Sequence, residues 1–220
     1  MNQQRIPPGP RLYFDMDGVL TNYGAIQRTE GASPSGRERP QSEISFWINM
    51  PPMWRPDVHF GEVQPLGGSN TAQSLRHFEE LFGRRLQILT SPSVKSPASY
   101  SGKAYWVEKH YGFNFAADRI NMTVHKDLYF RPGEMDWLVD DNVSGNGQEL
   151  WAEHGRLIHF GSDRFSNIWK VMGYFNKLKP VLEKFNPSHD STLEPSYDPY
   201  DPEKHQEYLE ELRQLEEEIR

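Results

Sequence analysis

The sequence near the amino terminus contains the stretch Arg11-Leu12-Tyr13-Phe14-Asp15-Met16-Asp17-Gly18-Val19-Leu20-Thr21. The apolar, β-prone residues before Asp15 predict a buried strand, and Gly18 allows the chain to turn tightly after it. In an open α/β sheet, ligands bind in the crevice beyond the carboxyl ends of the strands. The stretch therefore predicts an α/β protein whose chemistry lies at the end of its first strand.

The two carboxylates of this stretch, Asp15 and Asp17, are one residue apart. A turn at Gly18 can bring the second beside the first, so that one attacks phosphorus as a nucleophile while the other handles protons. Because two carboxylates and a phosphate repel one another, we expect a hard cation such as Mg2+ between them. The alternative is an ordinary Asp-x-Asp-Gly turn, since Asp and Gly are common turn residues.

The composition limits the class of protein. A chain of 220 residues is long enough for one α/β domain with an insert. The absence of cysteine excludes disulfides, thiol nucleophiles and thiolate zinc sites, and fits a cytoplasmic protein. No apolar run approaches the length of a membrane span, and the first ten residues lack a signal-peptide core. We therefore expect a soluble cytoplasmic protein without a membrane partner.

The negative charge is concentrated at the carboxyl end. The chain has a net charge of −7, and the residues from Pro187 onward contain 11 acidic and 3 basic side chains. The rest of the chain is therefore almost neutral, which argues against duplex nucleic acid as a partner because such a partner calls for a basic face. A small anion held by a metal and a few cations remains compatible with this balance.

Apolar runs that predict strands alternate with amphipathic segments that predict helices. The predicted strands are Arg11–Asp15, Arg85–Thr90, Asp118–Val124, Asp136–Asp141 and Arg156–Phe160. The predicted helices run from Ser69 or Asn70 to Gly83, from Lys103 to Gly112, from Gly147 to His154, and from Arg164 to Asn186 with a kink or break at Pro180. This alternation predicts βαβ units and a parallel five-stranded sheet.

The remaining segments suggest a division of the chain. We predict a flexible arm over 1–10, a core over 11–23 and 71–186, a cap or insert over 24–70, and an acidic extension over 187–220. The end of the extension predicts a helix with a narrow apolar stripe, Tyr208, Leu212, Leu215 and Ile219. Such a stripe could dock on the body of the protein or pair with another copy in a homo-oligomer.

Polar side chains gather at the predicted strand ends: Asp15 with Asp17, Thr90 with Ser91, Lys103 at a helix start, and Asp140 with Asp141. In a parallel sheet these positions share one edge. Together they provide a nucleophile, a second carboxylate, a hydroxyl donor, a cation and metal ligands, which is what phosphoryl transfer requires. The alternative is that Thr90 and Ser91 cap a turn and that Lys103 is a solvated lysine.

With these motifs the chain resembles the haloacid dehalogenase-like (HAD) superfamily, and more closely its 5'-nucleotidase C or 5'(3')-deoxyribonucleotidase family. The motifs occur in the family's order, as Asp15-Met16-Asp17-Gly18-Val19-Leu20, Ile88-Leu89-Thr90-Ser91-Pro92, Lys103-Ala104-Tyr105-Trp106-Val107-Glu108-Lys109-His110-Tyr111-Gly112 and Asp136-Trp137-Leu138-Val139-Asp140-Asp141. The resemblance covers Arg11 to Phe175. It implies a three-layer α/β/α Rossmann-like HAD domain with a small cap inserted after the first strand.

The resemblance also implies roles for the carboxylates. Asp15 would be the nucleophile that becomes an aspartyl-phosphate, and it would also bind Mg2+. Asp17 would be the general acid and then the general base, and its backbone carbonyl would complete the metal shell. Asp140 and Asp141 would hold the metal directly or through water, and we slightly favour Asp141 as the direct ligand.

The phosphate-binding residues implied by the resemblance are Thr90, Ser91 and Lys103. Thr90 would donate a hydrogen bond to a phosphoryl oxygen, and Lys103 would neutralise both the phosphoryl group and Asp15. This set implies a Mg2+-dependent phosphomonoesterase that acts on a small phosphorylated substrate.

The insert contains the aromatic cluster Phe46-Trp47-Ile48-Asn49-Met50-Pro51-Pro52-Met53-Trp54. As a hypothesis, Phe46, Trp47 and Trp54 would form an apolar wall against a nucleotide base, with Lys95 near the phosphate or sugar. The alternative is a hydrophobic plug that packs the insert onto the body. The best guess for the substrate is a nucleoside or deoxynucleoside 5'-monophosphate; a sugar phosphate or another small phosphoester, and a non-catalytic binding or assembly module, are the alternatives.

Overall fold

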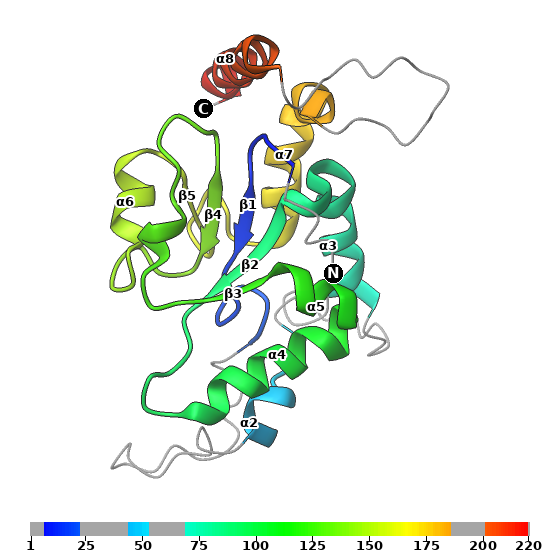
Figure 1. Ribbon diagram of the computed structural model, residues 1–220, viewed down its shortest axis with the longest axis vertical. Helices are drawn as coiled ribbons and strands as arrows, with labels where there is room; N and C mark the ends of the chain where they lie inside the picture. Colours follow the sequence, from blue (N-terminus) through cyan, green and yellow to red (C-terminus); the bar gives the residue numbers. More distant parts are fainter. Residues whose placement is uncertain (1–6, 23–43, 53–68, 186–200, 220) are drawn as a thin grey trace.

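The computed structural model describes residues 7–22, 44–52, 69–185 and 201–219. Its centre is a parallel five-stranded sheet with the strand order β3-β2-β1-β4-β5 (Figure 1). The strands are β1 (Leu12–Phe14), β2 (Leu86–Thr90), β3 (Ile120–Met122), β4 (Trp137–Asp140) and β5 (Leu157–His159). Each lies inside one of the five predicted segments, so the predicted parallel sheet is confirmed.

The sheet is covered on both faces. Successive side chains of a strand point to opposite faces, and on β1 Leu12 and Phe14 belong to the larger hydrophobic cluster while Tyr13 belongs to the smaller one. Helices α3 (Ser69–Phe82) and α7 (Ile168–Leu182) pack in the larger cluster, and α6 (Gln148–Glu153) contributes Trp151 to the smaller. Figure 1 shows α3 and α7 on one side of the sheet and α6 on the other, as in a Rossmann-like HAD fold.

Helix α4 begins earlier than the sequence analysis predicted. It runs from Pro97 to Tyr111, with Ser96 as its extended N-cap residue, so Lys103 lies in its second turn and not at its start. Proline fits the first turn of a helix because its fixed φ suits the helix and its missing N–H would have no intrahelical partner there. The pair Ser96-Pro97 therefore marks the start of this helix.

Two further helical segments differ from the predictions. Helix α5 (Phe113–Arg119) follows α4 directly after Gly112, whose φ is +91°, and was not predicted. Helix α7 continues past Pro180 to Leu182, followed by the 3-10 turn η4 (Glu183–Phe185), so the helix does not break at the proline. Proline lacks the N–H that bonds the carbonyl oxygen four residues earlier, so α7 loses one backbone hydrogen bond at Pro180 but continues for two more residues.

Most of the predicted insert lies outside the described residues, but helix α2 (Ile44–Ile48) is described and packs on α4. A Cβ atom on Gly102 of α4 would lie 2.3 Å from the Cβ of Trp47, so only glycine allows this close approach. The indole nitrogen of Trp106 donates a hydrogen bond to the carbonyl oxygen of Met50 at 2.7 Å. This part of the insert is therefore fixed against the body.

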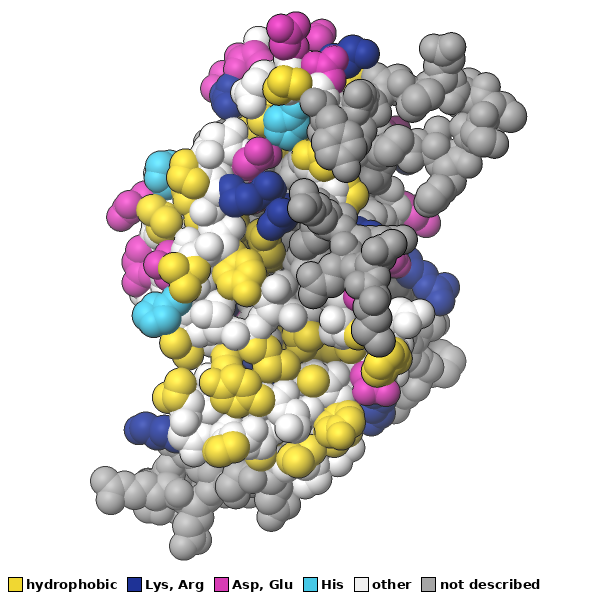
Figure 2. All heavy atoms as spheres, viewed as in Figure 1, with side chains coloured by type: hydrophobic (Ala, Val, Ile, Leu, Met, Phe, Trp, Pro, Cys, Tyr) yellow, Lys and Arg dark blue, Asp and Glu magenta, His cyan; other side chains and the backbone are white. Residues whose placement is uncertain are grey.

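The terminal helix α8 (Pro202–Ile219) docks on the body, which is one of the two alternatives for its apolar stripe. Leu209 and Leu212 are buried in the same hydrophobic cluster as α7. Figure 2 shows acidic side chains gathered on the outer surface of α8. Among the residues that the structure describes, no helix is both long and apolar enough to cross a membrane. Pairing with a second copy through α8 stays a prediction.

A buried carboxylate, Glu216, anchors α8 at the amino end of β4. Only 2% of Glu216 is exposed, and its carboxylate accepts hydrogen bonds from Arg156 at 2.7 Å, from the indole of Trp137 at 3.2 Å and from the hydroxyl of Tyr174. Burial, together with the charge of Glu216, raises the pKa of Tyr174, so its hydroxyl stays a donor. The cluster joins α8 to β4 and α7.

We expect Glu216→Ala to lower the free energy of unfolding by about 3 kcal/mol, because breaking a buried ion pair leaves Arg156 without its carboxylate. Urea unfolding followed by circular dichroism measures the change. The control is Glu217→Ala, which removes an exposed carboxylate from the same helix and should have little effect. Equal unfolding midpoints for the two variants would show that Glu216 does not anchor α8.

Candidate active site

The register of the sheet gathers the polar residues at one edge. Asp15 follows β1 directly, and β1 lies between β2 and β4, with Phe14 paired with Ile88 on one side and Val139 on the other. The backbone N–H of Asp15 continues the β4 pairing by donating to the carbonyl oxygen of Val139 at 2.8 Å. Asp15 therefore stands between the ends of its two neighbouring strands.

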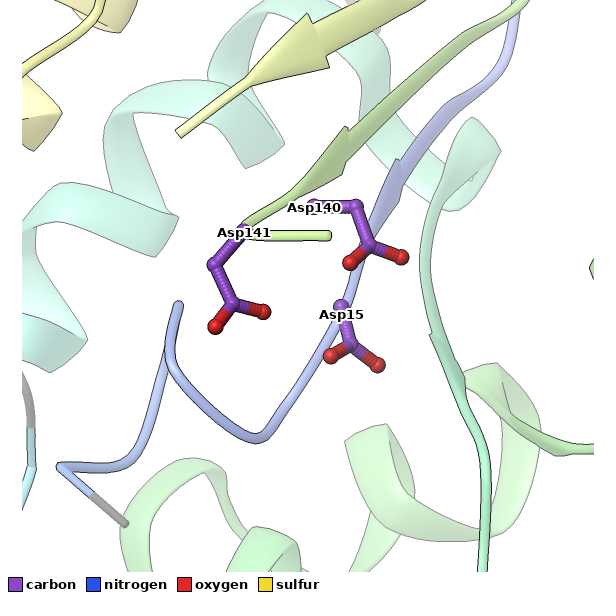
Figure 3. A group of neighbouring side chains, drawn as sticks. All are labelled: Asp15, Asp140 and Asp141. Atoms are coloured by element: carbon purple, nitrogen blue, oxygen red, sulfur yellow. The ribbon is translucent and has the colours of Figure 1, made fainter. Parts of the chain in front are cut away.

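Three carboxylates meet at this edge. Oxygen atoms of Asp15, Asp140 and Asp141 lie within 4.8 Å of one another, and Asp15 and Asp140 are buried. Figure 3 shows the three side chains, from the ends of β1 and β4, turned toward a common space. The side chain of Asp17 is not part of this group; the expected metal contact of Asp17 is through its backbone carbonyl and stays a prediction.

The tight turn after β1 brings its loop against the loop after β4. Gly18 has a φ of +79°, a conformation that L side chains rarely adopt, and a Cβ atom there would lie 2.1 Å from an oxygen of Asp141. Both observations require glycine at this position. The glycine of the opening motif thus allows the two carboxylate-bearing loops to approach each other.

The cluster fits a hard divalent cation. Three carboxylates supply oxygen donors of the kind that Mg2+ binds. Among the described residues, no hydrogen-bond donor is aligned with the buried Oδ1 of Asp15, although the ammonium group of Lys126 lies 2.7 Å from it. Burial, followed by the charges of Asp15 and Asp140, raises the pKa of Asp141 to about 7. A cation would relieve the repulsion that raises this pKa.

The pKa of Asp141 leads to a prediction about metal affinity. Because a carboxylate must lose its proton to bind a cation, protons compete with the metal at and below pH 7. We expect Mn2+, followed by its electron paramagnetic resonance signal, to bind about tenfold more weakly at pH 6 than at pH 8. Asp141→Asn should bind more weakly and lose this pH dependence; a pH dependence as steep as that of the wild type would contradict the prediction.

Lys103, which we expected to neutralise Asp15, makes its ion pair with Asp17. Its buried ammonium group donates hydrogen bonds to Oδ2 of Asp17, to the hydroxyl of Thr90 and to the carbonyl oxygen of Ser91, each at 2.8 Å. This reach follows from the position of Lys103 in the second turn of α4, above the end of β2. Its expected contact with a phosphoryl group stays a prediction.

Lys126 makes the ion pair with Asp15. It begins the 3-10 turn η3 (Lys126–Tyr129), is 1% exposed, and places its ammonium nitrogen 2.7 Å from Asp15 and 2.6 Å from Asp140. Burial lowers its pKa, but the two carboxylates outweigh this effect and raise the pKa above the ordinary value. Sequence reasoning missed this lysine, although it lies two residues beyond the predicted third strand, near the edge of the sheet where Thr90 ends the second.

Asp17 has the environment of a proton donor. Burial and the charge of Asp15 raise its pKa, while the charge of Lys103 opposes the shift. The net effect favours the protonated form more than in an ordinary aspartate. Ser91 shares Lys103 with Asp17, because its carbonyl oxygen accepts from the same ammonium group. Among the described residues the buried hydroxyl of Ser91 has no hydrogen-bond partner, and its expected contact with phosphate stays a prediction.

The predicted base-binding residues are only partly placed. Phe46 and Trp47 are 7% and 2% exposed, and the ring of Trp47 lies 5.4 Å from the ammonium nitrogen of Lys103. In the structure both residues pack in the core, as expected for a hydrophobic plug. Trp54 lies outside the described residues. Lys95 is exposed on the loop between β2 and α4, and its expected place near the phosphate or sugar stays a prediction.

Comparison with known proteins finds no matching family model, but two relatives. The chain is 28% identical over 170 residues to a protein of Vibrio phage KVP40, named provisionally as a 5'(3')-deoxyribonucleotidase, covering 75% of this chain and 84% of the relative. It is 27% identical over 155 residues to the human cytosolic-type 5'(3')-deoxyribonucleotidase, covering 63% and 74%. The resemblance to this HAD-type family is therefore confirmed, and it supports the assignment of the chain as an enzyme of the phosphatase class.

Proposed function

We propose that the chain is a Mg2+-dependent phosphomonoesterase that hydrolyses nucleoside or deoxynucleoside 5'-monophosphates. The observation that carries the proposal is the arrangement at the end of β1. The carboxylate of Asp15, the proposed nucleophile, lies beside two carboxylates that can hold a cation, and the pKa of the nearby Asp17 is raised. The names of the two relatives support a nucleotide as the substrate.

In the first step of the proposed reaction, a carboxylate oxygen of Asp15 attacks phosphorus and the bond between phosphorus and the ester oxygen breaks. Asp17 gives its proton to the leaving alkoxide, a role that suits its raised pKa. Lys126 holds Asp15, while Lys103 holds Asp17 and Thr90. The cation that Asp15, Asp140 and Asp141 would hold supplies positive charge against the phosphoryl oxygens.

In the second step, water attacks the phosphorus of the aspartyl-phosphate. Asp17, now ionised, takes a proton from the water, and the bond between phosphorus and Asp15 breaks to release inorganic phosphate. The cycle leaves Asp15 ionised and Asp17 protonated, as at the start. Reduction with borohydride during turnover would convert the aspartyl-phosphate to homoserine, and mass spectrometry of the peptide that contains Asp15 would detect it.

The test of the proposed function measures phosphate release from a panel of ribo- and deoxyribonucleoside monophosphates and several sugar phosphates, with Mg2+ and with EDTA. We expect metal-dependent release that is fastest with nucleotides. Faster release from sugar phosphates would support the same phosphatase reaction but would make a sugar phosphate, and not a nucleotide, the substrate. No release from folded protein across the whole panel would contradict the proposal and favour a binding or assembly module.

A further inference from the structure

We infer that Gln148 is a positioning residue that orients the carboxylate of Asp140 for the cation. The segment that contains it, residues 146–151, also fixes the backbone of Lys126. The inference rests on the proposed function, because it assigns a role toward the same cation site. Gln148 is the first residue of α6 and is fully buried.

The side-chain amide of Gln148 has two fixed partners. Its oxygen accepts a hydrogen bond from the backbone N–H of Asn146 at 2.7 Å, and its nitrogen donates to Oδ2 of Asp140 at 3.1 Å. A backbone N–H can only donate and an ionised carboxylate can only accept, so the amide can face these partners in one orientation only. The buried glutamine therefore presents a donor to Asp140.

The same segment also holds Lys126. The backbone N–H of Lys126 donates to the carbonyl oxygen of Asn146 at 2.8 Å, and the indole of Trp151 donates to the carbonyl oxygen of Lys126 at 3.1 Å. Gly147 lies in the same segment, and a Cβ atom there would lie 2.3 Å from an oxygen of Asp127 and 2.6 Å from its backbone nitrogen, so the two backbones approach closely. The start of α6 and the turn η3 are thus packed together at backbone level.

These contacts determine the orientation of the Asp140 carboxylate. Oδ2 accepts from Lys126 at 2.6 Å and from Gln148, while Oδ1 accepts from the backbone N–H of Asn142 at 2.9 Å. The ammonium group of Lys126 also contacts Asp15, so it can shift between the two carboxylates if one of them moves. The amide of Gln148 is instead bound to the backbone N–H of Asn146 and stays in place. It therefore holds the carboxylate of Asp140 at one angle beside Asp15 and Asp141.

Loss of a partner that orients a metal ligand typically weakens metal binding by about 10- to 100-fold. We expect Gln148→Met, which keeps the volume and removes the donor, to bind Mn2+ at least about tenfold more weakly, as measured by electron paramagnetic resonance without substrate. The matched control is Gln87→Met. Gln87 is a buried glutamine on β2 that donates to the carbonyl oxygen of Arg84 and accepts from Asn121, away from the acidic cluster.

A merely structural role for Gln148 would lower the melting temperature of Gln148→Met as Gln87→Met does, with no selective loss of Mn2+. Wild-type Mn2+ affinity in folded Gln148→Met would overturn the inference. If Gln148→Met does not fold, Gln148→Leu replaces it, because leucine also lacks the donor and adds no charge beside Asp140. If the wild-type protein binds Mn2+ but releases no phosphate, the proposed function is refuted, whereas the inference about Gln148 is still tested by Mn2+ binding.

Discussion

Asp15→Asn is expected to release phosphate from nucleoside monophosphates on the order of 10^4-fold more slowly than the wild type. The amide of asparagine cannot attack phosphorus to form the covalent intermediate, and the loss of one carboxylate also weakens the cation site. The fold should persist, because asparagine has nearly the same shape. In addition, the charge of Asp15 is one of the causes that raise the pKa of Asp140 and Asp141, so its removal relieves repulsion.

The measurement is kcat for phosphate release at saturating substrate and Mg2+, with circular dichroism to establish that the variant is folded. Asp163→Asn is the control, because it makes the same chemical change at an exposed aspartate before α7. Its kcat should equal that of the wild type. Substantial turnover by purified Asp15→Asn, beyond any wild-type contamination, would mean that another group attacks phosphorus.

The sequence was sufficient to predict which residues meet at the strand ends. Asp15, Thr90 and Asp140 all follow or end apolar runs that become adjacent parallel strands, so the topology of the sheet brings them together. The position of a lysine is harder to predict, because its long side chain can reach several groups. Lys103 and Lys126 both follow strands, and only the start of α4 at Pro97 and the packing of η3 against α6 determine which carboxylate each contacts.

The terminal helix α8 is a second case in which tertiary packing, and not the local sequence, determines the partners of a side chain. Its apolar stripe predicted a helix with one face that packs on another surface. In the structure Leu212 is buried, and the other three residues of the stripe are partly buried against the hydrophobic cluster. Glu216 lies one turn beyond Leu212, and a glutamate there is typical of a solvated face. Its burial depends on Arg156, Trp137 and Tyr174, which come from three other parts of the chain. Such pairing of a buried charge depends on tertiary structure and leaves no local pattern in the sequence.

The second large effect is expected for Lys126→Met, which should lower kcat by about 10^2- to 10^3-fold, as does the loss of one preorganised charge or donor in other active sites. Methionine keeps the bulk of the lysine stem but leaves Asp15 and Asp140 without their shared ammonium group. The charge of Lys126 lowers the pKa of Asp140 and Asp141, so both carboxyl groups should bind protons more tightly in the variant.

This proton uptake gives the variant a distinctive dependence of stability on pH. A carboxyl group whose folded-state pKa lies above its unfolded value destabilises the fold above the folded pKa, and the penalty disappears as pH falls. The loss of unfolding free energy in metal-free Lys126→Met should therefore be larger at pH 8 than at pH 6, whereas Lys177→Met, an exposed lysine of α7, should change neither stability nor kcat. A loss that is independent of pH would mean that Lys126 does not neutralise the buried carboxylates, since their protonation is what should restore stability.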